Sequence, residues 1–309
     1  MHRLAHDLIV VVGPTAAGKT ELAQALAERR GAAVLSADSM QIYRGMDIGT
    51  GKIPPHERTV PYFGLDIADP GQPYSAALFQ AYGREVIRFI DAQGGQCILC
   101  GGTGFYVRAV VDDYRFPAGE QTGNAVRDEY MARIDSEGAH AVWEELLRID
   151  PASAQIIHEN DVKRVIRAFE LLHEGTSYAR QREQLRSIPQ LYPAVFIGLS
   201  VTPSVLAGRI ERRVAGMVDN GLVDEVRTLL SRGLRGALTS SQAIGYKEIV
   251  AALDGAVSMD EAVERIVVAT RQYAKRQRTW FRKDKRIHWL DADEFDLTRL
   301  TAESEAILA

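Results

Sequence analysis

Residues 13–20 read GPTAAGKT and match the phosphate-binding loop pattern G-x-x-x-x-G-K-[ST]. The motif directly follows an apolar run, LIVVV at residues 8–12, and precedes residues 21–30, which are rich in Ala, Leu, Glu and Arg. A buried strand, a glycine-rich loop and a helix are the setting that this loop requires. The pattern therefore predicts a parallel α/β sheet with a site for a phosphate chain at its edge, but it does not say whose phosphate is bound.

Within this loop, Gly13 and Gly18 let the backbone wrap closely around oxygen atoms, with N–H groups pointing inward. The helix that follows adds the positive end of its dipole. Lys19 is a mobile cation for the terminal phosphate, and Thr20 is placed to hold Mg²⁺. We therefore expect Mg²⁺ as a cofactor.

Strand and helix patterns alternate from the loop to about residue 104. Residues 32–36 and 97–100 read as buried strands, and residues 75–93 have helical spacing. The apolar positions that share one stripe of this helix are Leu78, Tyr82, Val86 and Ile90. This alternation predicts a P-loop-containing open parallel sheet flanked by helices, in the α/β class.

The alternation stops at about residue 113, and the 309-residue length suggests roughly two domains. Residues 124–186 show long, highly charged helical patterns without a convincing strand. Later segments predict a strand at 194–200, helices at 204–218, 221–232 and 258–282, and a last strand at 286–290. We predict a core made of residues 1–113 and 191–309, with a helical insertion domain at residues 114–190.

Bulk properties exclude a membrane-spanning protein. The chain has a net charge of −4, which by itself indicates no polyanion partner. It has no apolar run of about 18 residues, so no transmembrane helix is expected. The N-terminal MHRLAHD lacks a signal-peptide pattern, and we expect a cytoplasmic protein that does not bind membranes.

The two cysteines, Cys97 and Cys100, form a C-x-x-C pair that suggests a redox or metal site. They lie in QCILCGG, which reads as a buried strand. Side chains alternate between the faces of a strand, so residues three apart point in opposite directions. We expect two buried, unpaired cysteines. A zinc finger is excluded because the chain has no further cysteine.

An acid that would hold Mg²⁺ in a nucleoside triphosphatase is missing from the expected place. Such enzymes carry a second acid after an apolar strand, but CILC ends in Gly-Gly and AVFIGLS ends in Ser. The segment YFGLD at residues 62–66 is a weak fit. Asp38 instead follows the strand at 32–36, so we expect it beside Lys19 and Thr20. It could orient Mg²⁺, accept a proton from a nucleophile, or simply cap a turn.

Two further groups are predicted near the loop. Gly101-Gly102-Thr103-Gly104 follows a strand, so the Thr103 hydroxyl should face the same crevice. A later helix carries three arginines, Arg209, Arg212 and Arg213. They form either a solvated face or a guanidinium that reaches the bound phosphates.

The sharpest charge feature is TRQYAKRQRTWFRKDKR, at residues 270–286. Helical steps of three and four place Arg271, Lys275, Arg278 and Arg282 on one stripe. In a chain that is acidic overall, such a stripe indicates contact with a polyanion, although a charged helix face is often only solvated. A second basic group, KRVIR, lies at residues 163–167 in the predicted insertion.

Six blocks together resemble one enzyme family. They are GPTAAGKT, SADSMQIYRGMDIGTGK, GGTGFYVRA, DVKRVIRAFELL, QAIGYKE and TRQYAKRQRTWFRKD, spread from about residue 8 to residue 290. They are similar to the tRNA dimethylallyltransferases, also called tRNA isopentenyltransferases, of the bacterial type. Eukaryotic members often carry a zinc finger after the segment at which this chain ends.

The resemblance implies a reaction. Members of the family transfer a dimethylallyl group from dimethylallyl diphosphate to N6 of adenosine 37, next to the anticodon. The diphosphate is then the leaving group, which accounts for the missing second Mg²⁺ acid. By position, Asp38 matches the general base on N6, and Lys19 and Thr20 match the ligands of the diphosphate and Mg²⁺. Thr103 matches a contact near the reacting centre, and Arg213 matches the arginine on the departing diphosphate.

The resemblance also implies two sets of binding residues. The diphosphate set is the whole loop, Gly13, Pro14, Thr15, Ala16, Ala17, Gly18, Lys19 and Thr20. The tRNA set consists of Asp38, Ser39, Met40, Gln41, Thr103, Arg127, Lys163, Arg164, Val165, Ile166, Arg167, Gln242, Ala243, Ile244, Gly245, Tyr246, Lys247, Arg271, Lys275, Arg278 and Arg282. The partner is expected to be the anticodon stem-loop of tRNA, bound by a monomer.

Three other functions also fit parts of the sequence. A small-molecule kinase has the same loop and sheet, but it would bind ATP tightly and would not need the basic helix. A non-catalytic RNA-binding module would tolerate the loss of Asp38. An adenylate isopentenyltransferase would act on a free nucleotide, and the basic helical insertion argues against it.

Overall fold

The computed structural model describes residues 4–116, 125–184, 188–237 and 239–309. The chain divides into two compact units. Unit 1 comprises Met1–Asp112 and Gln190–Ala309, and unit 2 comprises Asp113–Pro189. Both boundaries of unit 2 lie one residue before those predicted for the helical insertion, residues 114 and 190.

In the described part of unit 1, six parallel strands form one sheet in the order β3-β2-β4-β1-β5-β6. The strands are β1 (Leu8–Val12), β2 (Ala33–Ser36), β3 (Tyr62–Phe63), β4 (Cys97–Gly101), β5 (Ala194–Ser200) and β6 (Ile287–Asp291). Every residue of β1, β2 and β4 is buried, which explains why these strands read as continuous apolar runs. The predicted fold class is confirmed.

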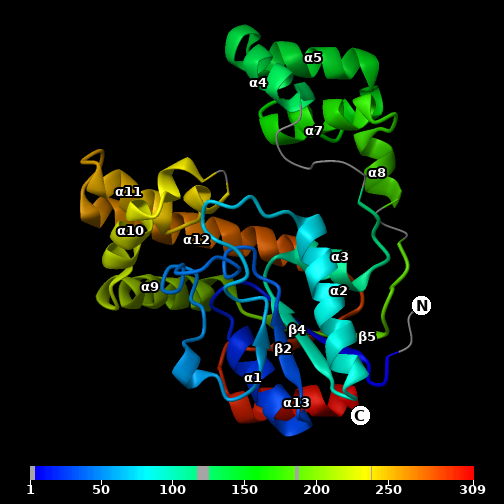
Figure 1. Cartoon of the computed structure of the whole chain (residues 1–309), viewed down its shortest axis with the longest axis vertical. Coiled ribbons are helices and arrows are strands. Elements are labelled where there is room, and N and C mark those ends of the chain that lie inside the picture. Colours follow the sequence, from blue (N-terminus) through cyan, green and yellow to red (C-terminus); the bar gives the residue numbers. More distant parts are fainter. Residues whose placement is uncertain (1–3, 117–124, 185–187, 238) are drawn as a thin grey trace. The chain divides into compact units, whose positions relative to one another are not determined.

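Helices cover both faces of this sheet (Figure 1). Helix α1 (Lys19–Arg30) connects β1 to β2, and α2 (Ala76–Ala92) connects β3 to β4. These connections cross the sheet in opposite directions, so right-handed crossovers place the two helices on opposite faces. Because β1 and β4 are parallel neighbours, the loop before α1 and the turn after β4 meet at the carboxyl edge of the sheet.

The buried face of α2 differs from the predicted stripe. Phe79, Val86 and Ile90 are buried, whereas Leu78 is 52% exposed. The predicted stripe and the buried face of α2 therefore share only Val86 and Ile90. Phe79 faces the core instead and stacks on Tyr106 of α3 (Gly104–Val111), with ring centroids 4.2 Å apart.

The two cysteines in β4 are free and buried, as the strand pattern predicted. Burial raises the pKa of Cys97 to about 12, and it does the same for Cys100. Thiols with such pKa values stay protonated at neutral pH and are poor nucleophiles and metal ligands. The redox and metal interpretations of the C-x-x-C pair are thus not supported.

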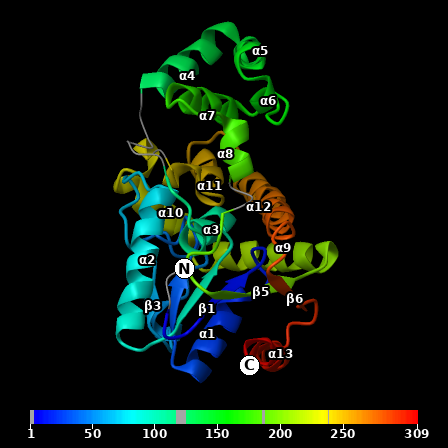
Figure 2. The same ribbon diagram turned by 90° about the vertical axis from the view of Figure 1, so that its right-hand side faces the viewer.

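The second part of unit 1 is mainly helical (Figures 1 and 2). Its helices are α9 (Pro203–Asp219), α10 (Leu222–Ser231), α11 (Tyr246–Leu253), α12 (Met259–Phe281) and α13 (Leu297–Leu308). Helix α12 begins after Ser258, whose Oγ accepts a hydrogen bond from the Glu261 N–H at 3.1 Å. It packs against α9, α11 and α3, and therefore crosses the region above the carboxyl edge of the sheet.

Unit 2 is helical in the part that the structure describes. Its helices are α4 (Ala125–Glu137), α5 (Ala139–Ile149), α6 (Pro151–Ala154), α7 (Val162–His173) and α8 (Tyr178–Gln184). The predicted helical span, residues 124–186, begins and ends on residues outside the described ranges. Unit 2 has its own apolar core, in which Tyr130 stacks on Phe169 with ring centroids 3.9 Å apart. None of the described helices, in either unit, has the length and apolar character needed to span a membrane.

Candidate active site

A cavity of about 610 Å³ opens at the carboxyl edge of the sheet in unit 1. It is lined by the phosphate-binding loop and by the residues that follow β2 and β4. Lining residues that bear on its chemistry are Thr15, Ala16, Gly18, Lys19, Thr20, Asp38, Gly101, Gly102, Arg209, Arg212, Arg213 and Gln277. The structure thus brings Asp38 and Arg213, from later parts of the sequence, to the same cavity as Lys19 and Thr20.

The loop adopts the conformation that its glycines permit. Gly18 has a φ of 92° and forms the N-cap of α1, so the amino end of the helix points at the cavity. Ala16 also has a positive φ, 62°, which is uncommon for a residue with a side chain. The Lys19 Nζ folds back and donates to the Pro14 carbonyl oxygen at 2.7 Å. The Lys19 ammonium group is therefore held against the loop that lines the cavity.

Lys19 and Arg213 are half-buried cations without an acidic partner among the described residues. Burial lowers the pKa of Lys19 and of Arg213, while the nearby Asp38 opposes both shifts. Arg213 Nη2 donates to the Thr50 carbonyl oxygen at 3.2 Å. Among the described residues neither cation forms an ion pair, so their positive charge remains available for an anion such as a diphosphate.

The other two predicted arginines behave differently from Arg213. Arg209 Nη2 donates to the carbonyl oxygens of Ala292 and Asp293, at 2.7 and 2.8 Å, in the segment after β6. Arg212 is exposed at the cavity wall. Arg213 is the one of the three whose charge is shown to interact with Asp38, which raises its pKa against the effect of burial.

Asp38 is oriented by its own turn. Its Oδ1 accepts a hydrogen bond from the Met40 N–H at 2.9 Å, so the turn-capping interpretation holds for this oxygen atom. The Oδ2 atom makes no hydrogen bond with the described residues. Thr103 Oγ1 accepts from the Ser39 N–H at 3.1 Å, which joins the ends of β2 and β4. Asp38 therefore presents one free carboxylate oxygen from a rigid support.

A second cavity of about 270 Å³ adjoins the first. Four residues line both cavities: Thr15, Asp38, Thr50 and Arg213. The remaining wall is mostly apolar and includes Met40, Val214, Met217, Ala243, Ile244 and Ile266. Tyr273 also lines it, and burial raises the pKa of Tyr273 to about 12, so its hydroxyl stays protonated at neutral pH. Asp38 and Arg213 thus lie between a polar cavity and an apolar one.

Gln277 is a site residue that the sequence analysis missed. It is 5% exposed and comes from α12. Its Oε1 accepts from the Thr15 N–H at 2.8 Å, and its Nε2 donates to the Gly102 carbonyl oxygen at 3.0 Å. One side chain thus ties the phosphate-binding loop to the turn after β4. The sequence did carry a signal for this residue. Gln277 is a polar residue on the same helical stripe as the apolar residues Ala274 and Phe281, and all three are buried.

Comparisons with known proteins identify the family of this chain. Two family models match, "IPP transferase" over residues 41–284 and "Isopentenyl transferase" over residues 6–60. The tRNA dimethylallyltransferase of Geobacillus thermodenitrificans is 46% identical over 291 residues, which cover 93% of this chain and 91% of the relative. That of Corynebacterium jeikeium is 41% identical over 303 residues, covering 97% and 96%. The chain belongs to the tRNA dimethylallyltransferase family.

Solved structures of the family resemble the whole chain. The full-length tRNA isopentenylpyrophosphate transferase of Bacillus halodurans has a TM-score of 0.71 at 40% identity, covering 98% of this chain and 97% of that one. A eukaryotic dimethylallyltransferase acting on tRNA has a TM-score of 0.81 at 26% identity, covering 98% and 78%. This chain is accordingly an enzyme, a prenyltransferase whose family acts on tRNA.

Of the residues predicted to contact tRNA in and after α12, Arg271, Lys275 and Arg282 are exposed and Arg278 is half-buried. Arg271 pairs with Glu211 of α9, whereas Lys275, Arg278 and Arg282 have no acidic partner among the described residues. Arg282 follows α12 directly as its C-cap. These three side chains are available for a polyanion.

The block at residues 242–247 is divided by burial. Gln242, Ala243, Ile244 and Gly245 line the second cavity. Tyr246 is fully buried, and its hydroxyl donates to Glu225 Oε1 at 2.6 Å. The inclusion of Tyr246 among residues that touch RNA with their side chains is therefore corrected, because its side chain packs inside unit 1. Lys247 is exposed.

The basic block of α7 in unit 2 is divided in the same way. Val165 and Ile166 are 1% and 3% exposed and belong to the apolar core. Their predicted contact with RNA is corrected, because these side chains have no exposed surface to offer. Lys163 and Arg164 are exposed, and Arg164 pairs with Asp161 at 2.5 Å.

Arg127 and Arg167 of unit 2 meet the same acid. They contact Glu170 at 2.8 and 3.0 Å, and the Glu170 side chain is 2% exposed. Burial alone would raise the pKa of Glu170, but the two arginines outweigh burial and lower it. These arginines stabilise unit 2 in addition to any contact that they make with RNA.

Proposed function

We propose that the chain transfers a dimethylallyl group from dimethylallyl diphosphate to N6 of adenosine 37 in tRNA and releases diphosphate. The observation that carries the proposal is that the two cavities meet at Asp38 and Arg213. One cavity has the features of a diphosphate site, and the other has the polarity expected for a nucleobase. The names of the relatives supply the two substrates' classes, a prenyl donor and tRNA.

The first cavity suits the leaving group. As the C–O bond of the donor breaks, negative charge grows on the diphosphate, where fixed donors stabilise the transition state most. The loop N–H groups, the amino end of α1 and Lys19 are oriented for this charge. Arg213 lines both cavities, as Asp38 does, so it would contact the oxygen atom from which the allyl group departs.

The residues present fit a bound Mg²⁺. Thr20 lines the first cavity, and its hydroxyl makes no hydrogen bond with the described residues. No cluster of three acidic, histidine or cysteine side chains that would cage a metal occurs among the described residues. Mg²⁺ usually keeps several waters and takes phosphate oxygens, so one protein hydroxyl suffices. Thr20 would hold the ion, which would offset charge on the diphosphate.

The second cavity suits the acceptor. Unstacking an adenine from the anticodon loop costs a few kcal/mol, and the unstacked base needs an apolar pocket to receive it. Its exocyclic N6 is a weak nucleophile because its lone pair is conjugated with the ring. The free Oδ2 of Asp38 would accept the N6 proton while N6 attacks the allylic carbon. The C–N bond forms, the C–O bond breaks, and the proton ends on Asp38.

A product assay tests the reaction. The chain is incubated with Mg²⁺ and unmodified tRNA, with either dimethylallyl diphosphate or ATP, and the tRNA nucleosides are analysed by mass. We expect isopentenyladenosine in the reaction with dimethylallyl diphosphate and none in the reaction with ATP. Nuclease fragments of the tRNA should locate the modified nucleoside at position 37. The absence of this nucleoside would contradict the proposed reaction.

Substitution of Asp38 tests the general base. Asp38→Ala and Asp38→Asn should lower kcat by about 10²–10⁴-fold, the usual contribution of a positioned base. The affinity for tRNA should stay within about threefold, because a single contact to one base is lost and no phosphate contact changes. Asp69→Ala, at an exposed loop position, is the matched control. Near-normal turnover of both Asp38 variants would reject this role.

A further inference from the structure

The segment at residues 43–53 determines where the Arg213 guanidinium lies. The Thr50 carbonyl oxygen accepts from Arg213 Nη2 at 3.2 Å and from Gln41 Nε2 at 3.4 Å. Gly51 packs directly against the guanidinium, since a Cβ atom there would lie 2.0 Å from Nη2. A small displacement of this segment would therefore move Arg213 relative to Asp38.

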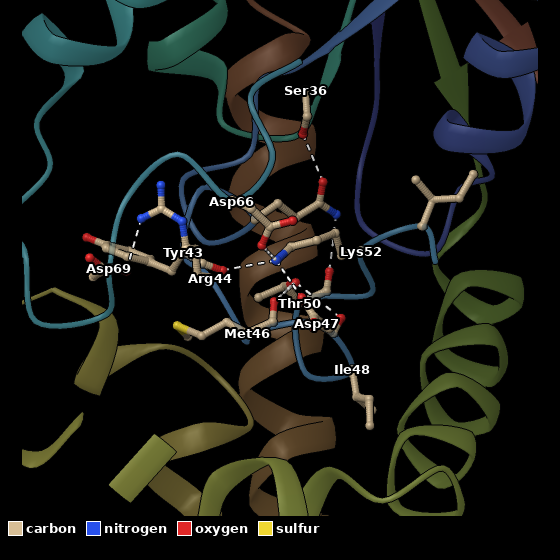
Figure 3. Close-up of polar contacts among 12 residues, drawn as sticks. Ser36, Tyr43, Arg44, Met46, Asp47, Ile48, Thr50, Lys52, Asp66 and Asp69 are labelled. Atoms are coloured by element: carbon tan, nitrogen blue, oxygen red, sulfur yellow. Dashed lines mark hydrogen bonds and ion pairs between the residues drawn. The ribbon is translucent and has the colours of Figure 1, made fainter. Parts of the chain in front are cut away.

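Lys52 lies at the centre of the contacts that hold this segment (Figure 3). Its side chain is 2% exposed. Nζ donates to the Tyr43 carbonyl oxygen at 3.0 Å, to Asp47 Oδ1 at 2.5 Å and to Asp66 Oδ1 at 2.7 Å. An ammonium group has three N–H donors, and all three are used here. Lys52 therefore has no donor left for a ligand, although its residue borders the first cavity.

These contacts close the segment on itself. Tyr43 lies at its start and Asp47 at its middle, and the Lys52 N–H also donates to the Asp47 carbonyl oxygen at 2.9 Å. Asp66 comes from the chain after β3 and has a φ of 57°, so the backbone there is held in the left-handed region. Lys52 thus joins three separate residues, Tyr43, Asp47 and Asp66, around the turn that carries Thr50.

Glu225 of α10 holds the same turn from the other side. Its carboxylate accepts from three successive backbone N–H groups, those of Asp47, Ile48 and Gly49, at 3.0, 2.7 and 3.2 Å. The acid fixes the backbone N–H groups and the lysine fixes the carbonyl and carboxylate oxygens. Removal of either would loosen the support of the Thr50 carbonyl oxygen.

We propose that Lys52 is a positioning residue for the departure of diphosphate, acting through the Thr50 carbonyl oxygen on Arg213. The inference rests on the proposed function, because it assumes that Arg213 faces the diphosphate. It assigns a task to a buried lysine that touches neither substrate. Asp66 itself does not line the first cavity, and its Oδ1 is taken by Lys52, which argues against a role for it as the second Mg²⁺ acid.

The test is a double-mutant cycle of Lys52→Met and Arg213→Ala, read by two measurements. The first is kcat for prenyl transfer, and the second is the Kd for inorganic diphosphate by calorimetry. We expect Lys52→Met to lower kcat by about 10–100-fold, the usual effect of displacing a catalytic group by a fraction of an ångström to one ångström. The Kd for diphosphate should rise, whereas KM for tRNA should change by less than about threefold.

In the Arg213→Ala background, Lys52→Met should change kcat and Kd by less than about threefold, because residues that act as a unit are not additive. Arg44→Met is the matched control, since Arg44 lies in the same segment and pairs with exposed Asp69. If Lys52→Met does not fold, Asp47→Asn and Asp66→Asn weaken the same contacts and replace it in the cycle. Circular dichroism establishes that each variant is folded.

Two outcomes would overturn the proposal. One is a full, multiplicative effect of Lys52→Met in the Arg213→Ala background. The other is unchanged kcat and diphosphate affinity accompanied only by a lower Tm. If the wild-type chain forms no isopentenyladenosine, the proposed function fails, but the diphosphate-binding cycle still reports whether Lys52 positions Arg213.

Discussion

The two site cations of unit 1, Lys19 and Arg213, and two arginines of unit 2 are held by different kinds of oxygen atom. Lys19 and Arg213 donate to backbone carbonyl oxygens. Arg127 and Arg167 contact the carboxylate of Glu170. A carbonyl oxygen orients a cation and leaves its charge intact, whereas a carboxylate neutralises it. The difference separates cations that can serve an anionic ligand from cations that stabilise the fold.

The pKa shifts follow the same division. Burial lowers the pKa of Lys19, because a charged ammonium is held there without a carboxylate partner. In unit 2 the arginines lower the pKa of Glu170 despite its burial. The first arrangement stores unfavourable charge that a diphosphate would relieve, and the second is satisfied without any ligand.

Lys19→Met should break the site in unit 1 without breaking the fold. We expect kcat to fall by about 10²–10³-fold, as for the loss of one donor to developing negative charge. The Tm should stay the same or rise, because an apolar side chain replaces a buried charge that lacks a carboxylate partner. Steady-state kinetics and thermal unfolding measure the two effects. If the variant keeps turnover within threefold of wild type, or if its Tm is well below that of wild type, Lys19 does not belong to the cations that serve an anionic ligand.

Glu170→Gln should show the opposite pattern in unit 2. The two arginines lose their common carboxylate, at a cost of roughly 1–3 kcal/mol, less than for fully buried pairs because both guanidinium groups reach water. Hydrogen exchange of peptides from α4 and α7 in the full chain measures the loss, and kcat should be unchanged. Glu174→Gln, which removes a single contact with Arg167 at 3.3 Å, is the control and should cost less than about 0.5 kcal/mol.

The effect of Glu170→Gln should also depend on pH. The pKa of Glu170 is lowered in the folded chain, so its ionised form stabilises unit 2 above the unfolded pKa of about 4.3. That stabilisation is lost as the pH falls through the folded pKa. The gap between wild type and variant should therefore be full at about pH 7 and shrink below about pH 4. An equal gap at both pH values would show that the carboxylate charge is not what stabilises unit 2.

Local patterns were enough to predict most of the fold and the strand-end part of the site. β1 and the loop after it are contiguous in sequence, and Asp38 and Thr103 follow buried strands whose ends must meet. The face of α2 was harder, because Leu78 and Phe79 both fit a helical stripe with Val86 and Ile90. Only the packing of α3 decides between them.

The residues that the sequence did not reveal act through distant partners. Gln277 contacts Thr15 across 262 positions of the chain, and Lys52 contacts Asp66 through a left-handed turn. Charge runs were ambiguous for the same reason. The blocks in α7 and α12 look alike as sequences; Glu170 follows Arg167 by three positions in α7, but its other partner, Arg127, comes from α4, 43 positions away.

The smallest expected effect compares these two basic helices by salt dependence. In α12, Arg278 and Arg282 have no acidic partner among the described residues. Arg278→Ala combined with Arg282→Ala should reduce the slope of log Kd for tRNA against log salt by about 1–2, since each phosphate contact contributes roughly one unit. Titrations by fluorescence anisotropy at several salt concentrations give the slope.

Arg164→Ala in α7 is the variant to compare with the α12 double variant, because Arg164 is already paired with an acid. Arg164 already contacts Asp161, so fewer counterions are displaced when RNA binds there, and its loss should change the slope by less than about 0.5. A third variant, Asp161→Ala, removes the competing acid and should make Arg164 behave like the α12 arginines. If the α12 double variant leaves the slope unchanged, that helix is only a solvated face. If Arg164→Ala changes the slope as much as the α12 pair does, internal pairing does not decide which cations serve tRNA.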